Sequence, residues 1–430
     1  MVVLQQLVGL DAPLACTLFS TLRGPLSLPS RAARAVSRRL APGGWGTPAM
    51  WQLGGHRLLA PAVGLRATST AAVSSCRAVM LPRFGGPEVR EVRPAVGVPS
   101  LKPRDVLVRS RAVSINPLDL RMRSGYGCSI FEPLLPLIIG RDISGEVAAV
   151  GTSVSSLTVG QEVFGALHPT AVRGTYADYA ILSEDELTLK PPSATRGILG
   201  DIYGPWYILE NFVIVQDASA IPFAALTAWR ALKSTARITN GQRLLVLGGG
   251  GAVGLAAIQI AVAAGCSVSA TCGSQSIERV LAFGAEQAID YTAEDIEVAI
   301  KGQFDAVLDT IGVPETERTG INLLKKGGHY MMLQAKTASL ADKYGLVIGI
   351  PAATTILLKK QLQYRYSHGI EYWWTYMRAD AEGLDEFRRL SEAGKLKIPV
   401  EETFPIAKVR KAHEVKEKRI IPGKVVLEVD

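Results

Sequence analysis

The chain has 430 residues, of which 48% are hydrophobic and 20% are charged, and its formal net charge is +8 at pH 7. A chain of this length and composition can bury one large or two ordinary cores, so a soluble, globular class is the default. Evenly spread basic residues would suggest a nucleic acid or an anionic membrane as partner. The excess is concentrated at the N-terminus, which excludes a nucleic-acid partner from the first hypotheses.

The first 76 residues hold seven arginines, no lysine and one acid, Asp11. This leader contributes +6 and leaves +2 for the remaining chain. Abundant Arg, Ser and Ala with almost no acid are typical of an organelle transit peptide. We therefore predict a disordered transit peptide over residues 1–76 and a location in the mitochondrial matrix, with a plastid as the alternative.

Five cysteines form no CxxC pair and no repeated spacing, so the sequence indicates neither a structural zinc lobe nor a disulfide framework. The longest apolar runs are interrupted by Gly, Pro or charge before they reach the roughly 20 residues that span a bilayer. The sequence thus predicts a chain without a transmembrane segment.

After the leader, short alternating runs punctuated by Gly and Pro, such as residues 106–109 and 144–147, predict a small β barrel. From Ala218 onward helices and strands alternate, which is typical of a parallel sheet with crossover helices. We expect helices at 221–233 and 253–264, and strands at 243–247, 267–271, 288–291, 305–309 and 329–333. From about Gln361 a helix-rich tail leads to a final strand over residues 424–429.

Residues 196–216 interrupt this order with a strongly apolar and aromatic stretch between the barrel and the first expected helix. A long apolar connection inside a compact domain is uncommon. Two explanations stay open: a surface insertion that contacts a partner or membrane, and translated non-coding sequence, which we favour because the change of character at Thr195 is abrupt.

The expected strand 244–247 runs into a glycine turn, residues 248–251, and then into a helix. Gly249, Gly251 and Gly254 satisfy the GxGxxG spacing. Glycine lets the turn be tight and the backbone approach a pyrophosphate, while the helix N-terminus offers free N–H groups to the anion. The flanking strand and helix favour dinucleotide binding over a merely flexible glycine loop.

The choice of cofactor depends on the end of the second strand, where an NAD site places an acid. Residues 271–276 contain no acid, and Thr271, Gly273 and Ser274 offer small hydroxyl and backbone donors. Such donors can hold a 2′-phosphate that a carboxylate would repel. We therefore expect NADPH, with Arg279 either assisting the phosphate or lying on a solvated helix face.

Several motifs follow one another in a fixed order between residues 77 and 430. They are Asn116-Pro117-Leu118-Asp119, Arg123-Ser124-Gly125-Tyr126, Gly140-Arg141-Asp142, Ser144-Gly145, Val159-Gly160-Gln161-Glu162-Val163, Leu226-Thr227-Ala228, the glycine turn, Phe283-Gly284-Ala285, Ile289-Asp290-Tyr291, Val307-Leu308-Asp309-Thr310 and Gly423-Lys424-Val425-Val426. Together they resemble the zinc-free quinone oxidoreductase branch of the medium-chain dehydrogenase/reductase family. Within that branch, residues 402–405 and the leader are similar to the mitochondrial reticulon-4-interacting protein group.

The resemblance implies a GroES-like, β-rich barrel domain and a Rossmann domain with a doubly wound parallel sheet. We place the barrel domain at 77–220, with the atypical insertion 196–216, and the Rossmann domain at 221–360. Residues 361–430 are then a C-terminal segment that returns to the barrel. The nicotinamide would lie between the two domains, with cofactor contacts at Asn116, Thr227, Gly249, Gly250, Gly251, Ala252, Val253, Gly254, Thr271, Gly273, Ser274, Tyr291, Thr310, Leu333 and Lys424.

The plainer alternatives are that Asn116 caps a turn, that Thr227 merely sits in its helix and that Tyr291 belongs to the core. Zinc-dependent members of the same family carry a Cys and a Gly-His-Glu as ligands. Here Asn116 and Gly140-Arg141-Asp142 stand at the matching places, so we expect no metal.

Without a metal, the cofactor carries the chemistry, and the protein positions it against an electron-poor acceptor such as a quinone or another conjugated carbonyl. Tyr126 and Asp119 are the polar candidates on the substrate side, although Tyr126 could be packing and Asp119 could anchor its loop. The rival hypothesis is an NADPH-binding accessory protein that serves a reticulon-type partner or ubiquinone synthesis. A homodimer is also compatible with the resemblance.

Overall fold

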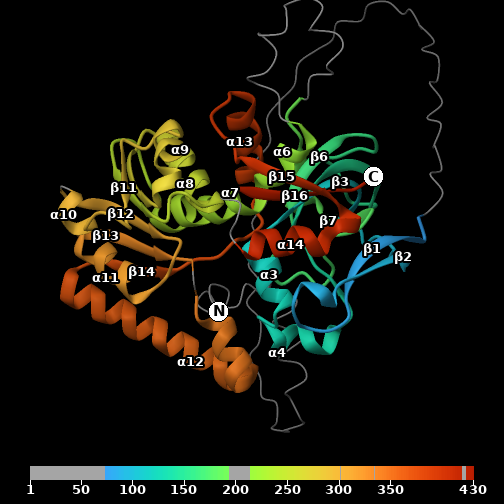
Figure 1. The fold of residues 1–430 in the computed structure, drawn as a ribbon, viewed down its shortest axis with the longest axis horizontal. Coiled ribbons are helices and arrows are strands. Elements are labelled where there is room, and N and C mark those ends of the chain that lie inside the picture. Colours follow the sequence, from blue (N-terminus) through green and yellow to red (C-terminus); the bar gives the residue numbers. More distant parts are fainter. Residues whose placement is uncertain (1–72, 193–213, 301, 334, 419–422) are drawn as a thin grey trace, which may run out of the picture. The chain divides into compact units, whose positions relative to one another are not determined.

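The computed structural model describes residues 73–192, 214–300, 302–333, 335–418 and 423–430 (Figure 1). The predicted transit peptide therefore lies outside the described residues, except for its last four. Of these, Ser75 and Cys76 open the first strand, β1 (Ser75–Leu81). Most of the expected insertion 196–216 also lies outside the described residues.

The β-rich part of the chain forms two sheets. In the smaller sheet, β1 lies between β2 (Glu91–Gly97) and β4 (Leu137–Ile138). The larger sheet runs in the order β15 (Val400–Pro405), β16 (Lys424–Glu428), β3 (Asp105–Ile115), β5 (Asp142–Val150), β6 (Glu162–Ala166) and β8 (Leu187–Leu189), with β7 (Tyr179–Ser183) paired to β3. Because β16 pairs antiparallel with β3, the last strand of the chain completes a sheet begun by its first third.

The predicted parallel sheet is confirmed, and all its strand pairs are parallel. Its order is β11 (Gln287–Asp290), β10 (Ser267–Cys272), β9 (Arg243–Leu247), β12 (Phe304–Asp309), β13 (Leu324–Met332) and β14 (Glu371–Trp374). In chain order this is 3-2-1-4-5-6, the doubly wound arrangement in which the order reverses between β9 and β12. Ligands of such sheets bind at the carboxyl ends of the strands near this reversal.

Helices connect these strands and pack on them. The barrel part carries α3 (Pro117–Arg123), α4 (Cys128–Phe131) and the short turns η1 (Pro87–Val89), η2 (Glu132–Leu134) and η3 (Glu184–Glu186). The remaining helices are α6 (Val215–Ala220), α7 (Pro222–Trp229), η4 (Arg230–Ala236), α8 (Ala252–Ala263), η5 (Ser274–Ser276), α9 (Ile277–Ala282), α10 (Ile296–Ala299), α11 (Pro314–Asn322), α12 (Thr337–His368), α13 (Ala381–Glu392), η6 (Ile406–Lys408) and α14 (Val409–Glu417).

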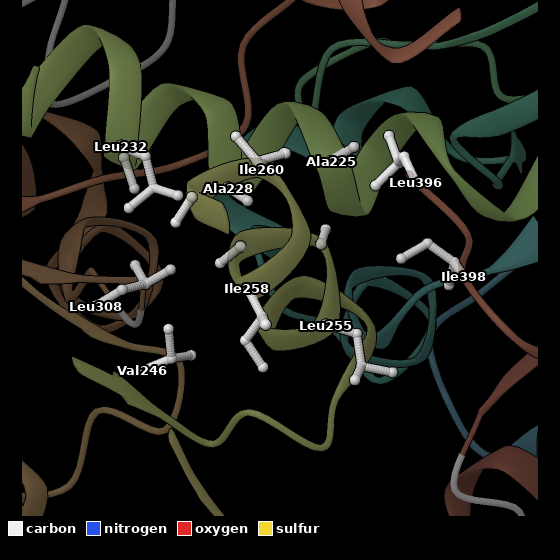
Figure 2. Close-up of a cluster of buried hydrophobic side chains, with 14 of the residues drawn as sticks. Ala225, Ala228, Leu232, Val246, Leu255, Ile258, Ile260, Leu308, Leu396 and Ile398 are labelled. Carbon is white, nitrogen blue, oxygen red and sulfur yellow. The ribbon is translucent and has the colours of Figure 1, made fainter. Parts of the chain in front are cut away.

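Figure 2 shows the core that fixes the helix after the glycine turn. Leu255 and Ile258 of α8 are fully buried, and Ala225 and Ala228 present the small side chains of α7 to α8. Small residues let the two helices approach closely, while each buried Leu or Ile contributes about 1.5–3 kcal/mol of transfer free energy. The turn is thus attached to a rigid helix.

Three boundaries differ from the sequence expectations. The helix expected over residues 221–233 begins as α7, which ends at Trp229. The chain continues as a π-helical turn, η4, so the expected helix changes type inside its span. The segment 196–216 overlaps α6, which begins at Val215 and packs on β3, β5 and β16. The parallel sheet extends beyond residue 360, because β14 pairs with β13 along the full length of β14.

The fourth difference is α12, a helix of 32 residues that the sequence reading placed only from about Gln361. Among the described residues it is the one helix that is long and apolar enough to cross a membrane by length and composition, and 22% of its most apolar window is buried. The sequence reading took Gly and Pro as interruptions. Gly345 does break the helical backbone, with φ of 74°, but the helix runs through Pro351.

Candidate functional site

The glycine turn after β9 has the shape that a phosphate site requires. Gly248 has φ of +86°, and a Cβ there would lie 2.3 Å from the Thr310 hydroxyl. A Cβ on Gly254 would lie 2.4 Å from the Gly248 carbonyl oxygen, so this glycine allows α8 to pack on the turn. At Gly251, by contrast, the nearest atom to such a Cβ is 3.8 Å away. The turn is therefore closed on its protein side and open at Gly251, where α8 begins.

Two threonines hold this turn in place. Thr271, at the end of β10, accepts the backbone N–H of Gly249 with its carbonyl oxygen at 2.7 Å and that of Gly248 with its hydroxyl at 3.2 Å. The Thr310 hydroxyl donates to the Leu247 carbonyl at 2.9 Å. Both residues were expected to contact a cofactor. Their hydrogen bonds give them a role in shaping the turn, and their contact with a cofactor stays a prediction.

The loop after β10 contains no acid of its own, but the structure places the carboxylate of Asp290 beside it, which the sequence analysis did not predict. The Ser274 hydroxyl donates to the carboxylate of Asp290, which also accepts the Thr292 hydroxyl at 2.6 Å. The hydrogen bond from Ser274, followed by those from Thr292, lowers the pKa of Asp290. Asp290 ends β11, opposite Cys272 of β10, so only the register between two strands places it here.

Two further residues near this loop, Tyr291 and Arg279, were named in the sequence analysis. Tyr291 is 53% exposed, which excludes the core alternative, and its hydroxyl is 3.9 Å from a Cβ built on Gly273. Tyr291 thus borders the space above Gly273. Arg279 pairs with Glu401 of β15 at 2.7 Å, so its guanidinium is held by a carboxylate rather than lying on a solvated helix face.

A buried polar cluster lies where the barrel meets α7. The ammonium of Lys424 lies 2.9 Å from Asp142 Oδ2 and donates to Asn116 Oδ1 at 2.7 Å and Ser114 Oγ at 2.8 Å. Asn116 Nδ2 and Ser114 Oγ donate to the same carboxylate oxygen, at 2.8 and 2.5 Å. All four side chains are at most 2% exposed. The cluster is therefore a fully hydrogen-bonded ion pair in a dry environment.

This cluster also positions α7. Asp142 Oδ1 accepts the backbone N–H of Phe223 at 2.7 Å, in the first turn of the helix that carries Thr227. A carboxylate at a helix N-terminus is stabilised by the free N–H groups and the helix dipole. The Thr227 hydroxyl donates to the Phe223 carbonyl at 2.7 Å, as a threonine that merely sits in its helix would.

Asp119 lies next to this cluster but does not reach a cavity. It is fully buried and accepts the backbone N–H of Asn116 at 2.7 Å, which caps α3. Burial raises its pKa to about 6. The Tyr176 hydroxyl lies 3.4 Å from the carboxylate. These contacts favour the anchoring alternative over a proton donor to substrate.

An apolar pocket lies between α3, α4 and the start of α12. Its volume is about 140 Å³, and Tyr126 lines it with a half-buried ring. Burial raises the pKa of the Tyr126 hydroxyl, which keeps it protonated as a hydrogen-bond donor. The lining also includes Leu118, Met122, Ile130, Phe131, His168, Thr170, Ala335, Thr337, Ala341, Leu346, Ile350 and Tyr376.

His168 and Tyr376 are polar pocket residues that the sequence reading did not select. The ring Nδ1 of His168 lies 2.8 Å from the Thr170 hydroxyl, just after β6. Tyr376 follows β14, at the carboxyl end of the parallel sheet. In the sequence, both residues are marked only by their position shortly after a strand. For Tyr376 this position is informative only once β14 is recognised as part of the parallel sheet. Leu333 follows β13 in the same way, and its N–H donates to the Asp309 carbonyl at 3.0 Å.

The buried polar cluster around Lys424 does not fit a metal ion. Within the described ranges, no group of three or more His, Cys, Asp or Glu residues is arranged to hold one. The Lys424 ammonium already supplies the cation beside Asp142. Arg141 is fully buried and donates to the carbonyls of Gly140, Pro169 and Ala171. The positive charges of Lys424 and Arg141 would repel a metal ion bound beside them, and the metal-free site stays a prediction.

Two families and several known proteins are similar to this chain. An alcohol dehydrogenase GroES-like domain family matches residues 102–192, and a zinc-binding dehydrogenase family matches residues 283–427. The mitochondrial NAD(P)H oxidoreductase RTN4IP1 of Mus musculus is 31% identical over 400 residues, which cover 87% of this chain and 95% of the relative. The 2-methylene-furan-3-one reductase of Solanum lycopersicum is 32% identical over 62% of this chain and 64% of its own.

A solved quinone oxidoreductase from Coxiella burnetii superposes with a TM-score of 0.66 at 26% identity, covering 83% of this chain and all of the other. The GroES-like domain and the Rossmann-like parallel sheet expected from the sequence are thereby confirmed.

Proposed function

Because the chain belongs to the medium-chain dehydrogenase/reductase family, whose members similar to it include NAD(P)H oxidoreductases and reductases of quinones and enones, we propose that it is an NADPH-dependent reductase of a quinone or another conjugated carbonyl. The observation that carries the proposal is the pairing of an open glycine turn with an apolar pocket lined by a protonated tyrosine. A dinucleotide fits the first, and a flat apolar acceptor fits the second.

The glycine turn fits the pyrophosphate. The open position at Gly251 and the start of α8 supply N–H groups without a side chain in the way. NADPH, when bound, supplies the hydride. The chain's own contribution is to hold the turn through Thr271 and Thr310 and to fix α7 through Asp142. Such fixed positioning is how a protein accelerates a transfer whose chemistry belongs to the cofactor.

NADPH rather than NADH is supported by the loop after β10, which lacks an acid of its own. Asp290 stands behind Ser274, and its carboxylate already accepts three hydrogen bonds from Ser274 and Thr292. A carboxylate engaged in this way has little remaining capacity to accept ribose hydroxyls. The backbone N–H groups of Gly273 and Ser274 and the hydroxyl of Tyr291 are therefore the groups that we assign to a 2′-phosphate.

In the pocket, Tyr126 is the group placed to donate a hydrogen bond to the carbonyl oxygen of the acceptor. Conjugation spreads the negative charge that develops on this acceptor, so one neutral donor is enough to stabilise it. No step requires a metal, because polarisation by Tyr126 replaces the Lewis acid that zinc provides in alcohol dehydrogenases. Asp119 caps the N-terminus of α3, the helix that precedes Tyr126, and we assign it a positioning role.

The proposal is tested by following NADPH oxidation by the purified protein with a panel of quinones and enones, with NADH in parallel. We expect turnover with NADPH, a markedly higher KM for NADH and no loss of activity in the presence of a chelator. Tyr126→Phe should lower kcat while leaving NADPH binding intact. Equal or tighter binding of NADH would contradict the assignment of the 2′-phosphate. Chelator inactivation reversed by zinc would contradict the metal-free site.

The alternative is an NADPH-binding accessory protein in the mitochondrial matrix, serving a reticulon-type partner or ubiquinone synthesis. It is favoured by the small volume of the pocket and by the absence, among the described lining residues, of any acid. Tight NADPH binding without consumption by any acceptor would select this alternative. The matrix location follows from the leader and is tested by fusing residues 1–76 to a fluorescent reporter, since a cytosolic reporter would refute it.

A further inference from the structure

The helix α12 is apolar on two opposite faces, and the described part of the chain covers only one of them. Gly349, Ala353 and Leu357, four residues apart, form the buried face: Gly349 packs on Ala341 at the start of the same element, and α12 as a whole contacts β14. Ala353 and Leu357 belong to the same core cluster as Tyr372 and Trp374 of β14. A helix that is apolar all round is normally buried on all sides. This one is not (Figure 1).

The uncovered face is a continuous stripe. It begins with the adjacent pair Val347 and Ile348 and continues at positions separated by three or four residues, a spacing that keeps side chains on one side of a helix. Val347 is 78% exposed, Ile348 is 62% exposed, Leu362 is 55% exposed and Tyr366 is 85% exposed. We call these residues, with Pro351, Thr355 and Leu358, the α12 stripe. Large aliphatic groups so exposed lose the free energy that burial would provide, about 25 cal/mol per Å².

The charges bordering this stripe have one sign. Residues 343–368 contain three lysines and one arginine and no acid. Lys343 and Lys359 are exposed beside the stripe. Lys360 and Arg365 reach back to Glu317 and Glu371. Asp342, the acid just before this range, accepts N–H groups of Gly127 and Ser129 and so belongs to the contact with α4.

Charge decides between the occupants that an apolar stripe could take. In a two-fold dimer the stripe would face its own copy, and the same lysines would border both sides of the interface. Like charges around an apolar contact weaken it. An anionic lipid surface has the opposite requirement: it attracts lysines at the level of the headgroups and accepts aliphatic and aromatic side chains just beneath them.

We propose that the α12 stripe binds the surface of an anionic lipid bilayer, with the helix lying in the plane of the interface. The helix does not cross, because its other face is held against β14 by core contacts. Val347, Ile348, Leu362 and Tyr366 enter the headgroup region, and Lys343 and Lys359 contact lipid phosphates.

The helix that carries the stripe also contributes to the apolar pocket. Leu346 and Ile350, which directly precede Val347 and Pro351 of the stripe, line that pocket. A protein docked through the stripe therefore presents this pocket near a bilayer in which apolar molecules dissolve. The docking itself involves neither the cofactor nor an acceptor, so it stands or falls separately from the proposed function.

The test is co-sedimentation of the full chain with vesicles of phosphatidylcholine, alone or mixed with phosphatidylglycerol. Because the basic leader can bind the mixed vesicles itself, the informative quantity is the difference between variants that share this leader. The double variant Ile348→Ser/Leu362→Ser should bind mixed vesicles at least about tenfold more weakly than the wild type. Lys359→Glu should weaken binding several-fold, and added salt should reduce that difference.

Matched controls come from equally exposed residues elsewhere. Val172 is 53% exposed and Val298 is 76% exposed, and Lys395 is an exposed lysine on another segment. Val172→Ser/Val298→Ser and Lys395→Glu should bind as the wild type does, and thermal denaturation reports the folding of every variant. Equal vesicle binding by stripe and control variants overturns the proposal. So does a wild-type dimer that Ile348→Ser/Leu362→Ser separates while vesicle binding is unchanged, because the stripe is then a contact between two copies.

Discussion

The glycine turn and the buried polar cluster around Lys424 are built in opposite ways. The turn is a local structure in which backbone atoms form the site and residues 248–254 suffice to specify it. The cluster joins Ser114, Asn116, Asp142 and Lys424, which are up to 310 residues apart in the sequence. A site made of backbone depends on what side chains are missing, whereas a site made of buried charges depends on every partner being present.

The largest effect should come from breaking the cluster. Lys424→Met leaves Asp142 buried without its cation, and we expect the free energy of unfolding to fall by about 3–5 kcal/mol. The matched control is Lys325→Met, which removes the partially exposed partner of Asp305 and should cost less than about 1 kcal/mol. Chemical denaturation measures both.

A second variant shows whether charge or packing is responsible. Adding Asp142→Asn to Lys424→Met removes the unpaired carboxylate and should recover part of the lost stability. If Lys424→Met and Lys325→Met cost the same, the cluster is not the dry ion pair described above.

The turn should respond to a change that leaves folding intact. Ala252 is the first residue of α8, where a carboxylate favours the helix dipole but repels a pyrophosphate. Ala252→Asp should therefore keep or slightly raise thermal stability while weakening NADPH binding at least about tenfold. Ala252→Asn is the neutral control of the same shape. Equal affinities of the two variants, measured by calorimetric titration, would mean that the pyrophosphate binds elsewhere.

Asp119, which lies next to the cluster, should make the free energy of unfolding depend on pH. Its folded pKa of about 6 lies above the unfolded value, so the stability that it contributes is present below the unfolded pKa and is lost as pH rises through about 6. Relative to Asp119→Asn, the wild type should lose up to about 3 kcal/mol between about pH 4 and about pH 7. Denaturation of both proteins across this range measures it, and a constant difference would contradict the raised pKa.

The smallest effect is expected from the segment between the barrel and α7. Because Gln216 belongs to α6 and donates to Glu428 at 3.0 Å, the deletion should stop at residue 213 rather than 216. Deleting residues 196–213 should change the free energy of unfolding by less than about 0.5 kcal/mol and preserve or improve soluble yield and NADPH affinity. Deleting residues 196–216 should cost more. Loss of folding in the shorter deletion would make the segment part of the core.

The contrast between local and long-range structure explains which features could be predicted from the sequence. The strand β9 and the start of α8 were placed within one residue, because a buried apolar run followed by glycines is a local signal. The register that brings Asp290 to Ser274 and the strand β14 that brings Tyr376 to the pocket depend on pairing between distant segments. Lys424 was named from the family resemblance, but its ion pair with Asp142 follows only from the antiparallel pairing of β16 with β3.

The same reasoning applies to α12. A chain read one residue at a time treats Gly349 and Pro351 as breaks, yet Gly349 is where the helix packs closely on the segment at Ala341. Propensity is a weak signal, and tertiary contacts override it. The two apolar faces of this helix become visible only when β14 has been placed on one of them.

The most direct test of the proposed reaction follows the transferred atom. The protein is incubated with NADPH that carries deuterium on the reactive face of the nicotinamide and with an enone, and the product is analysed by mass spectrometry. Direct transfer predicts one deuterium on the carbon β to the carbonyl for each NADPH consumed, with none arriving from deuterated water at that position. Unlabelled product, or label that exchanges with solvent, would contradict hydride transfer in the pocket of Tyr126.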